Sequence, residues 1–198
     1  MKAFEGFKSE ASSTKFPMLE AGPYIAVIKD AKVDGDEPDQ SLIIRVDITE
    51  GEQAGYFTKR YKHEESNGGG KYAVRYKGDY RLRIPNTDNP NSKYPESDLR
   101  RFNDAIFRIE SSNPGYKWDW NESGLKGKAI GISMQAGEYN GIPYTTIGRL
   151  ETVDDIRKGL VTVMPPKKPR GTVHTPESMA ADDSVPAGFT QIETEVPF

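Results

Sequence analysis

The chain of 198 residues contains no cysteine. Disulfides, thiolate zinc sites and cysteine nucleophiles are therefore excluded. Histidine is nearly absent too, because His63 and His174 are the only two, so a multi-histidine metal site is not expected. No run of about 18 apolar residues occurs, and we therefore expect no transmembrane helix. These absences predict a protein that works without a metal or another cofactor and without membrane contact.

Apolar residues are also scarce, at 35% of the chain. So small a fraction predicts a packed core of roughly 130–150 residues and a sizeable unpacked remainder. Residues Met1 to Gly6 lack the apolar stretch of a secretory signal. We therefore expect the protein in the cytoplasm.

Charge is distributed unevenly along the chain, although the net charge is only -3. No lysine or arginine follows Arg170, whereas acidic residues continue to the end of the sequence. Between Lys59 and Arg83 the bias reverses, with eight basic residues against three acidic ones. The basic residues are Lys59, Arg60, Lys62, Lys71, Arg75, Lys77, Arg81 and Arg83. This segregation predicts a surface that binds a polyanion and a separate acidic tail.

Hydrophobic patterning predicts a β-rich core with one long helix. Alternating residues and turn signals indicate strands over 24–29, 41–48, 56–63, 128–134 and 142–150, with a further alternating run at 71–84. Triple glycine at 68–70 predicts a flexible loop before that run. Leu99, Phe102, Ile106 and Ile109 share one face of a helix that opens at Ser97–Asp98.

Two further local signals complete the predicted domain. Asn140–Gly141 predicts a tight hairpin between the last two strands. Thr152 predicts the N-cap of a short helix that runs through Lys158. Trp118 and Trp120 follow the long helix, and we expect them to cap the core.

The order of these elements matches an OB-fold, a five-stranded Greek-key β-barrel with one helix between its third and fourth strands. The expected fold class is therefore mainly β, with an extended β-hairpin insertion at 71–84 and a disordered C-terminal tail. Another small β-rich domain with helices is the alternative. The predicted boundaries are an N-terminal arm over 1–21, the domain over 22–163, and a linker with an acidic tip over 164–198.

Two stretches of the sequence carry a family resemblance. Gly22–Ile28 with Leu42–Ile48, and later Gly124–Gly131 with Glu138–Gly141, resemble bacteriophage single-stranded-DNA-binding proteins that have OB-folds. The resemblance implies a phage-encoded protein of the bacterial cytoplasm. It also implies binding of single-stranded DNA without strong sequence preference, in replication, recombination and repair.

The final residues, 193–198, are similar to the C-terminal tip of bacterial single-stranded-DNA-binding proteins, which is acidic and ends in Pro-Phe. The similarity implies that replication, recombination or repair proteins dock here, with the Phe198 ring inserted into a basic-rimmed pocket and Pro197 stiffening the approach. Val196 and Thr194 interrupt the acidic residues of the tip. The residues implied in partner binding are Asp182, Asp183, Glu193, Glu195, Val196, Pro197 and Phe198.

Binding of a nucleic-acid strand requires cations for the phosphates and flat rings for the bases. The basic residues of 59–83 supply the first. The candidate stacking rings are Tyr56, Phe57, Tyr61, Tyr72, Tyr76 and Tyr80. Near the last hairpin, Lys128, Tyr139 and Arg149 are further candidates.

Two alternatives stay open for the run at 71–84. Its tyrosines could share a buried face with Val74, Leu82 and Ile84, leaving the basic face merely solvated. The run could instead form an arm that is hinged at 66–70 and closes over the bound strand.

We find no catalytic motif in the sequence. Gly68–Lys71 is not a phosphate-binding loop, because Tyr72 stands where a serine or threonine is needed. We therefore predict a protein that is not an enzyme. The alternative is a protein–protein interaction module, such as a phage inhibitor or structural protein, that docks through its Pro-Phe tail. The sequence leaves homo-oligomerisation open.

Overall fold

The computed structural model describes residues 16–67, 74–86 and 95–170. Within these residues the chain forms one antiparallel sheet of five strands with helices packed around it. In chain order the elements are β1 (Gly22–Asp34), β2 (Ser41–Ile48), α1 (Tyr56–Ser66), β3 (Asp79–Arg83), α2 (Pro95–Ser112), the 3-10 helix η1 (Glu122–Leu125), β4 (Ala129–Tyr139), β5 (Ile142–Glu151) and α3 (Val153–Arg157). The predicted mainly β fold is confirmed.

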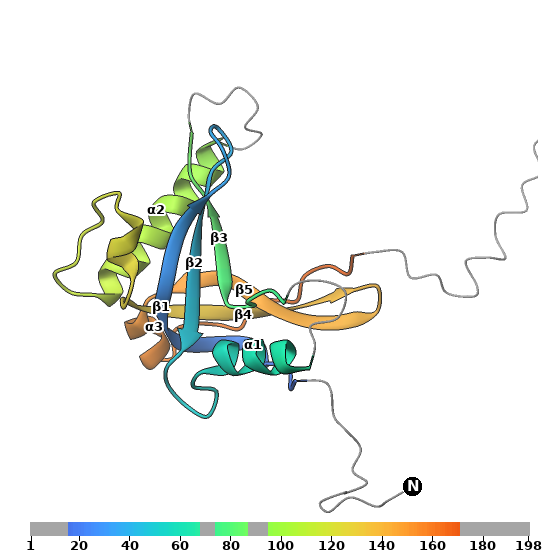
Figure 1. Cartoon of the computed structure of the whole chain (residues 1–198). Helices are drawn as coiled ribbons and strands as arrows, with labels where there is room; N and C mark the ends of the chain where they lie inside the picture. The colour runs from blue at the N-terminus through green and yellow to red at the C-terminus, as the bar shows by residue number, and fades with distance from the viewer. Residues whose placement is uncertain (1–15, 68–73, 87–94, 171–198) are drawn as a thin grey trace, which may run out of the picture.

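The sheet has the strand order β3-β2-β1-β4-β5, and β1 is its central strand. β1 pairs with β4 over Gly22 to Val27 and with β2 over Ala26 to Asp34, and the pairing with β2 shifts register between Ile28 and Asp30. One long strand therefore serves two groups of neighbours, and the β4–β5 hairpin crosses the direction of β2 and β3 (Figure 1). The described sheet is open, with β3 and β5 at its edges, so the structure does not confirm a closed barrel.

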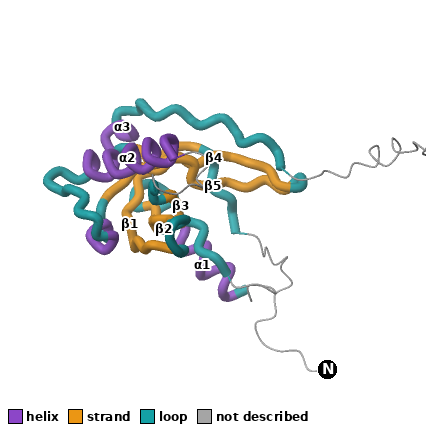
Figure 2. Tube along the Cα trace, turned by 90° about the horizontal axis from the view of Figure 1, so that it is seen from above, coloured by secondary structure: helices purple, strands orange, loops and turns teal. Residues whose placement is uncertain are grey.

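The core lies between the inner face of this sheet and α2. Every second residue of β2 contributes to the core, as the alternation of the sequence predicts. The helix α2 contacts β3, β4 and β5, and it lies against the sheet on the side away from α1 (Figure 2). Its core residues are Phe102, Ala105, Ile106 and Ile109, and those that β2 contributes to the same core are Leu42, Ile44, Val46 and Ile48.

Two local predictions are confirmed in detail. Asn140 and Gly141 turn the β4–β5 hairpin with φ angles of 51° and 76°, the left-handed values that a tight primed turn requires. The hydroxyl of Thr152 accepts a hydrogen bond of 3.0 Å from the Asp155 amide and so caps α3.

Two predicted strands are wrong in type or extent. Residues 56–63, expected to be the third strand, belong to the helix α1. Within the described part of the alternating run, residues 74–84, only Asp79–Arg83 form a strand, which pairs with β2 and is the third strand in chain order. Gly78 marks the change, because its carbonyl accepts a hydrogen bond from the Val46 amide and extends the contact with β2 by one residue.

The end of the described chain lies along the β4–β5 hairpin. Beyond Met134, β4 no longer pairs with β1. Residues up to Arg170 lie beside this part of β4 instead, and Arg170 forms a parallel bridge with Tyr139. The Lys167 amide donates to the Ala136 carbonyl at 2.9 Å, and the Asn140 amide donates to the Arg170 carbonyl at 3.0 Å. The residues from 164 to 170, which the sequence assigned to a linker, therefore bring the chain to the tip of the hairpin.

None of the helices in the described ranges has the length and apolar character that crossing a bilayer requires.

Candidate nucleic-acid interface

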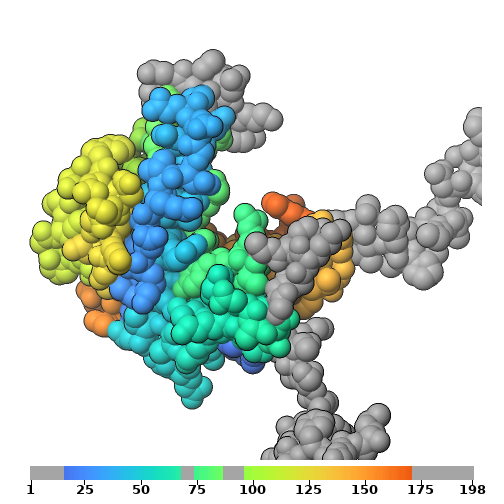
Figure 3. Space-filling view, in the orientation of Figure 1, coloured from blue at the N-terminus to red at the C-terminus, as the bar shows by residue number. Residues whose placement is uncertain are grey.

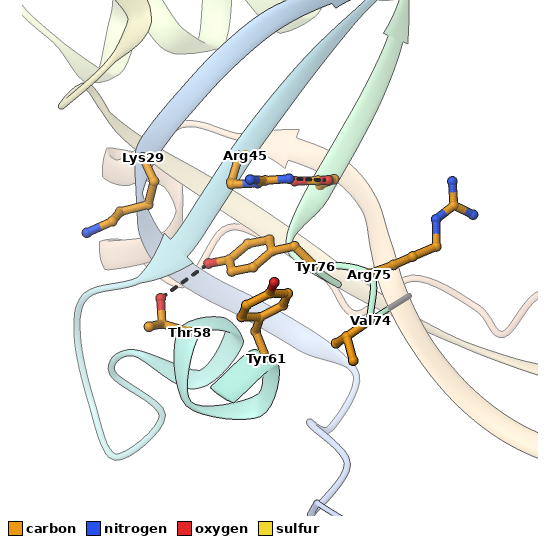
Figure 4. A pocket seen from close by; sticks show the side chains of 8 residues that line it. Lys29, Arg45, Thr58, Tyr61, Val74, Arg75 and Tyr76 are labelled. Atoms are coloured by element: carbon orange, nitrogen blue, oxygen red, sulfur yellow. Dashed lines mark hydrogen bonds and ion pairs between the residues drawn. The ribbon is translucent and has the colours of Figure 1, made fainter. Parts of the chain in front are cut away.

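A surface hollow of about 480 Å³ lies where the outer face of β1 and β2 meets α1. Figure 4 shows its lining, and Figure 3 shows α1 standing out from the surface below the two strands. The hollow collects side chains from four separate segments of the sequence. They are Lys29 of β1, Arg45 of β2, Thr58 and Tyr61 of α1, Val74, Arg75 and Tyr76 before β3, and Asp79 of β3.

The position of α1 depends on a side chain of β2. Gly55 precedes the helix with a φ of 74° and offers no capping side chain. Asp47, only 5% exposed, takes this role from the neighbouring strand. One of its carboxylate oxygens accepts hydrogen bonds from the amides of Ile48 and Phe57, each of 3.0 Å, and the other accepts from the Thr58 hydroxyl. This bond set attaches the first turn of α1 to the sheet.

Tyr56 and Phe57 anchor the same turn in the core, with exposed fractions of only 4% and 2%. The Tyr56 hydroxyl donates to the Pro17 carbonyl at 2.8 Å and accepts from the Leu19 amide at 3.0 Å. Tyr61 follows Tyr56 by five residues and Phe57 by four, about one helical turn later, and its side chain lines the hollow. The anchors thus determine which aromatic ring of α1 faces outward.

Gly78 allows the chain before β3 to lie directly on β2. A Cβ atom at this position would stand 2.5 Å from the Val46 carbonyl oxygen and 2.8 Å from the Phe57 ring. The Tyr76 hydroxyl can therefore donate to the same Val46 carbonyl at 3.0 Å. Close approach at glycine is what places the Tyr76 ring at the hollow.

Tyr76 lies between two other side chains of the hollow (Figure 4). The Arg45 guanidinium carbon stands 4.8 Å from the ring centroid on one side, a cation–π contact. The Tyr61 ring centroid lies 6.0 Å away on the other side, with the two planes tilted by 48°. Arg45 is held in place by two hydrogen bonds to the Asp79 carboxylate, of 2.8 and 3.0 Å. Tyr76 is therefore a supporting ring that packs against the core, and Tyr61, which is also only partly buried, lies on its other side.

Burial raises the pKa of Tyr76 from its ordinary 10.0 to about 12. The folded protein therefore favours the neutral phenol, whereas the unfolded chain ionises near pH 10. The contribution of Tyr76 to stability is complete below pH 10 and is lost between about pH 10 and 12, because the unfolded state loses its proton first. We expect the difference in unfolding free energy between the native chain and Tyr76→Phe to narrow over that range. Urea unfolding at pH 9 to 12 measures it, and parallel curves would contradict the assignment.

The side chains that line the hollow carry more positive than negative charge. Lys29 and Arg75 are exposed at its rim, whereas the one acidic residue of its lining, Asp79, is paired with Arg45. Figure 4 shows Lys29 and Arg75 extending to opposite sides of the aromatic pair. An extended anion that crosses the rings would meet a cation at each end of its path.

The basic residues of β3 are less available for binding an anion than the sequence suggests. Arg81 donates to Asp34 at 2.6 Å, and Arg83 bonds to Asp39. Asp34 is the last residue of β1, and Asp39 lies in the turn that follows it and leads to β2. This turn neutralises part of the basic block, and it does so on the same face of the sheet.

The structure corrects three predicted stacking residues. Tyr56 and Phe57 are core residues of α1, and Tyr80 is buried on the inner face of β3. Because a base cannot reach these rings, we exclude them from the interface. Lys71 and Tyr72 lie outside the described residues.

The remaining basic candidates of α1 and its neighbourhood are spread around the helix. Lys59 donates to the Ala54 carbonyl at 2.7 Å, and Arg60 pairs with Glu64 at the same distance. Lys62 and Lys77 are exposed. None of the four lines the hollow.

The three candidates near the last hairpin do not join the hollow either. Lys128 lies 4.5 Å above the Tyr116 ring, and Arg149 bonds to the buried carboxylate of Glu151 at 2.6 Å. Tyr139 is exposed at the hairpin tip. The partner-binding residues proposed from Asp182 to Phe198 lie outside the described part of the chain.

Sequence reasoning missed Lys29, Arg45 and Thr58 as lining residues. A signal was present for Arg45, because it lies on the polar face of a strand whose other face is fully apolar. Lys29 stands beside the register shift of β1, which alternation alone does not locate.

No model of a known protein family matches this sequence, and no curated protein matches it either. Among the described residues, no group of three or more histidines and carboxylates is arranged to hold a metal ion.

Proposed function

We propose that this protein binds single-stranded DNA, without strong sequence preference, across the hollow between β1, β2 and α1. The observation that carries the proposal is the Tyr61–Tyr76 pair with Lys29, Arg45 and Arg75 around it. Ring faces accept any base, and cations along the path bind the phosphates. A hollow lined in this way binds a strand without reading its sequence.

The fold supports the same proposal. We infer that the sheet is an OB-fold barrel in a partly open form, which is common for this fold. The strand order β3-β2-β1-β4-β5 needs only contact between β3 and β5 to close, and a small cavity is lined by both Tyr80 of β3 and Leu150 of β5. In OB-folds the outer face of the second and third strands binds oligonucleotides. The proposed hollow lies beside those strands here.

Fluorescence anisotropy tests the proposal directly. A labelled oligo-thymidine and a duplex of equal length are titrated with the full chain at two salt concentrations, without divalent ions. We expect salt-sensitive binding of the single strand and a much weaker duplex signal. Failure to bind either would refute the proposal and favour the protein–protein interaction module. The C-terminal partner role for residues 193–198 is a separate proposal, which rests on the sequence alone.

Tyr61→Ala should lower the affinity for oligo-thymidine by about 5- to 160-fold, since stacking contributes roughly 1–3 kcal/mol per base. Tyr61→Phe is the matched control, because it retains the ring and loses only the hydroxyl. Its affinity should stay within about twofold of the native value if stacking is the interaction that matters. Equal losses in both variants would show that the ring does not stack on a base. The same anisotropy titration measures both.

A further inference from the structure

A second surface depression, of about 730 Å³, lies between α1 and the first half of β5. Its volume exceeds that of the hollow that holds Tyr61 and Tyr76. Figure 1 shows the β4–β5 hairpin extending past the C-terminal end of α1. We call the depression the hairpin groove, and its lining consists of Phe16, Met18, Arg60, Glu64, Lys77 and residues 142–146.

The hairpin groove and the hollow are neighbours on the surface, because the same two segments line both. On α1, Tyr61 lines the hollow, whereas Arg60, one residue earlier, lines the groove. Before β3, Tyr76 lines the hollow, whereas Lys77, one residue later, lines the groove. A strand that leaves the tyrosine pair toward the hairpin therefore passes directly from one depression into the other.

The groove offers an aromatic ring that the hairpin holds in place. Tyr144 of β5 pairs with Gly137 of β4. A Cβ atom at Gly137 would stand 2.6 Å from Cζ and 2.7 Å from the hydroxyl oxygen of Tyr144, so the phenol end of this ring lies directly over the glycine. Because Tyr144 is half-buried and lines the groove, the side of its ring turned away from Gly137 is the one that a base can reach.

The charge of the groove favours a polyanion as its occupant. The lining contains two cations and one carboxylate, and this carboxylate, Glu64, is paired with Arg60 at 2.7 Å. Lys77 is exposed and forms no ion pair with any residue that the structure describes. Hydrogen bonds between the main chain of Arg170 and the hairpin place a further basic residue beside the turn that leads to Ile142. A strand in the groove would therefore have unpaired positive charge near it.

We propose that the hairpin groove is a second subsite for single-stranded DNA, in which a strand already bound at Tyr61 stacks a further base on Tyr144. The inference rests on the proposed function and extends it, because it makes strand length a determinant of affinity. Short strands occupy the hollow alone, whereas longer strands reach both subsites and gain the contacts of the groove. The subsite depends on α1, a helix between the second and third strands that the sequence did not predict.

Fluorescence anisotropy with oligo-thymidines of about 4 to 16 nucleotides, the range of strand lengths that single OB-folds bind, tests the subsite. The affinity of the native chain should rise with length until both subsites are filled. Tyr144→Ala should lower the affinity for the longest strand by about 5- to 160-fold, the effect of one stacked base, and should change that for the shortest strand by less than about twofold. Tyr144→Phe retains the ring and should bind every length as the native chain does.

Gly137→Ala tests the position of the ring without removing any group. The added methyl group takes the space of the Tyr144 phenol end, which must rotate away. Affinity for the longest strand should fall as in Tyr144→Ala, and the double variant should lose no more than Tyr144→Ala alone, because both changes remove the same contact. Lys77→Glu, outside the hairpin, should weaken binding of the longest strand and reduce its salt slope by about 0.7. Circular dichroism shows whether each variant folds.

The native titration separates failure of the subsite from failure of the proposed function. A native chain that binds no oligo-thymidine of any length would overturn both. A native chain that binds, with folded Tyr144→Ala, Gly137→Ala and Lys77→Glu variants that keep its affinity at every length, would show that the hollow binds strands and the groove does not. Equal losses in these variants at all lengths would also overturn the subsite, because a short strand held at Tyr61 does not reach the groove.

Discussion

Replacing both Lys29 and Arg75 with glutamate should weaken binding of oligo-thymidine by about 100-fold at low salt, because two phosphate contacts become two repulsions. Both side chains are exposed at the rim of the hollow, on opposite sides of the aromatic pair. Neither substitution requires a change in the core. The loss should therefore appear in affinity and not in the free energy of unfolding.

The salt dependence gives this prediction a second readout. Each phosphate contact with a single strand contributes about 0.7 to the slope of log affinity against log salt concentration. Loss of two contacts should therefore reduce the slope by about 1.4, and the effect of the substitutions should shrink as salt rises. Anisotropy titrations at three or more salt concentrations measure both quantities.

A matched control separates local contacts from total charge. Lys117→Glu with Lys158→Glu changes the net charge by the same amount, on exposed residues of the loop after α2 and of the turn after α3. Its affinity should fall only slightly, because neither residue lines the hollow. If the control loses as much affinity as the rim variant, the overall charge governs binding and the proposed path of the strand is wrong.

The basic residues of β3 show why a run of like charges in a sequence does not establish the charge of a surface. Basic and acidic residues are segregated along the chain, and this predicted one strongly positive face. The fold instead brings the acidic turn at 34–39 against β3, where Asp34 binds Arg81 and Asp39 binds Arg83. Pairing across the sheet joins residues more than 40 positions apart, and no local pattern contains that information.

Local signals, by contrast, located the elements that depend on local physics. The Asn140–Gly141 turn, the Thr152 cap and the apolar stripe of α2 each need only neighbouring residues, and each is present in the structure. The first member predicted for the stripe, Leu99, is the exception, because its side chain is 40% exposed. Trp120 is a position at which local signals did not predict the extent of burial. The Phe102 ring stacks on one side of it at 5.8 Å, yet Trp120 remains 71% exposed, and so it caps the core less completely than the sequence led us to expect.

The helix α1 was mistaken for a strand for a related reason. Alternating bulky and basic residues over 56–63 fit a two-residue period, and no serine, threonine or aspartate stands at the helix start to indicate otherwise. The capping carboxylate is Asp47, which lies eight residues before Gly55 on β2. Helix formation here depends on the strand already being in place.

That dependence makes Asp47→Ala the substitution with the largest expected effect on stability. It removes a buried carboxylate that accepts three hydrogen bonds, and it leaves the amides of Ile48 and Phe57 without this acceptor. Each unsatisfied buried donor costs about 1–3 kcal/mol, so the free energy of unfolding should fall by about 3 kcal/mol. Urea unfolding followed by circular dichroism measures the change.

Asp47→Asn is the conservative comparison. Its amide oxygen can still accept from the two backbone amides, and its amide nitrogen can donate to the Thr58 hydroxyl, so the loss should be about 1 kcal/mol. The comparison of the two losses in unfolding free energy tests the capping role more sharply than either loss alone. Similar losses for alanine and asparagine would mean that the charge of the carboxylate matters and that its hydrogen-bond geometry does not.

The same substitution also connects stability to the proposed site. Because Asp47 holds the first turn of α1, and α1 carries Tyr61, loosening that turn should displace the Tyr61 ring from the hollow. Under conditions where Asp47→Ala is still folded, its affinity for oligo-thymidine should fall toward that of Tyr61→Ala. Undiminished affinity in a folded but destabilised Asp47→Ala would place strand binding somewhere other than beside α1.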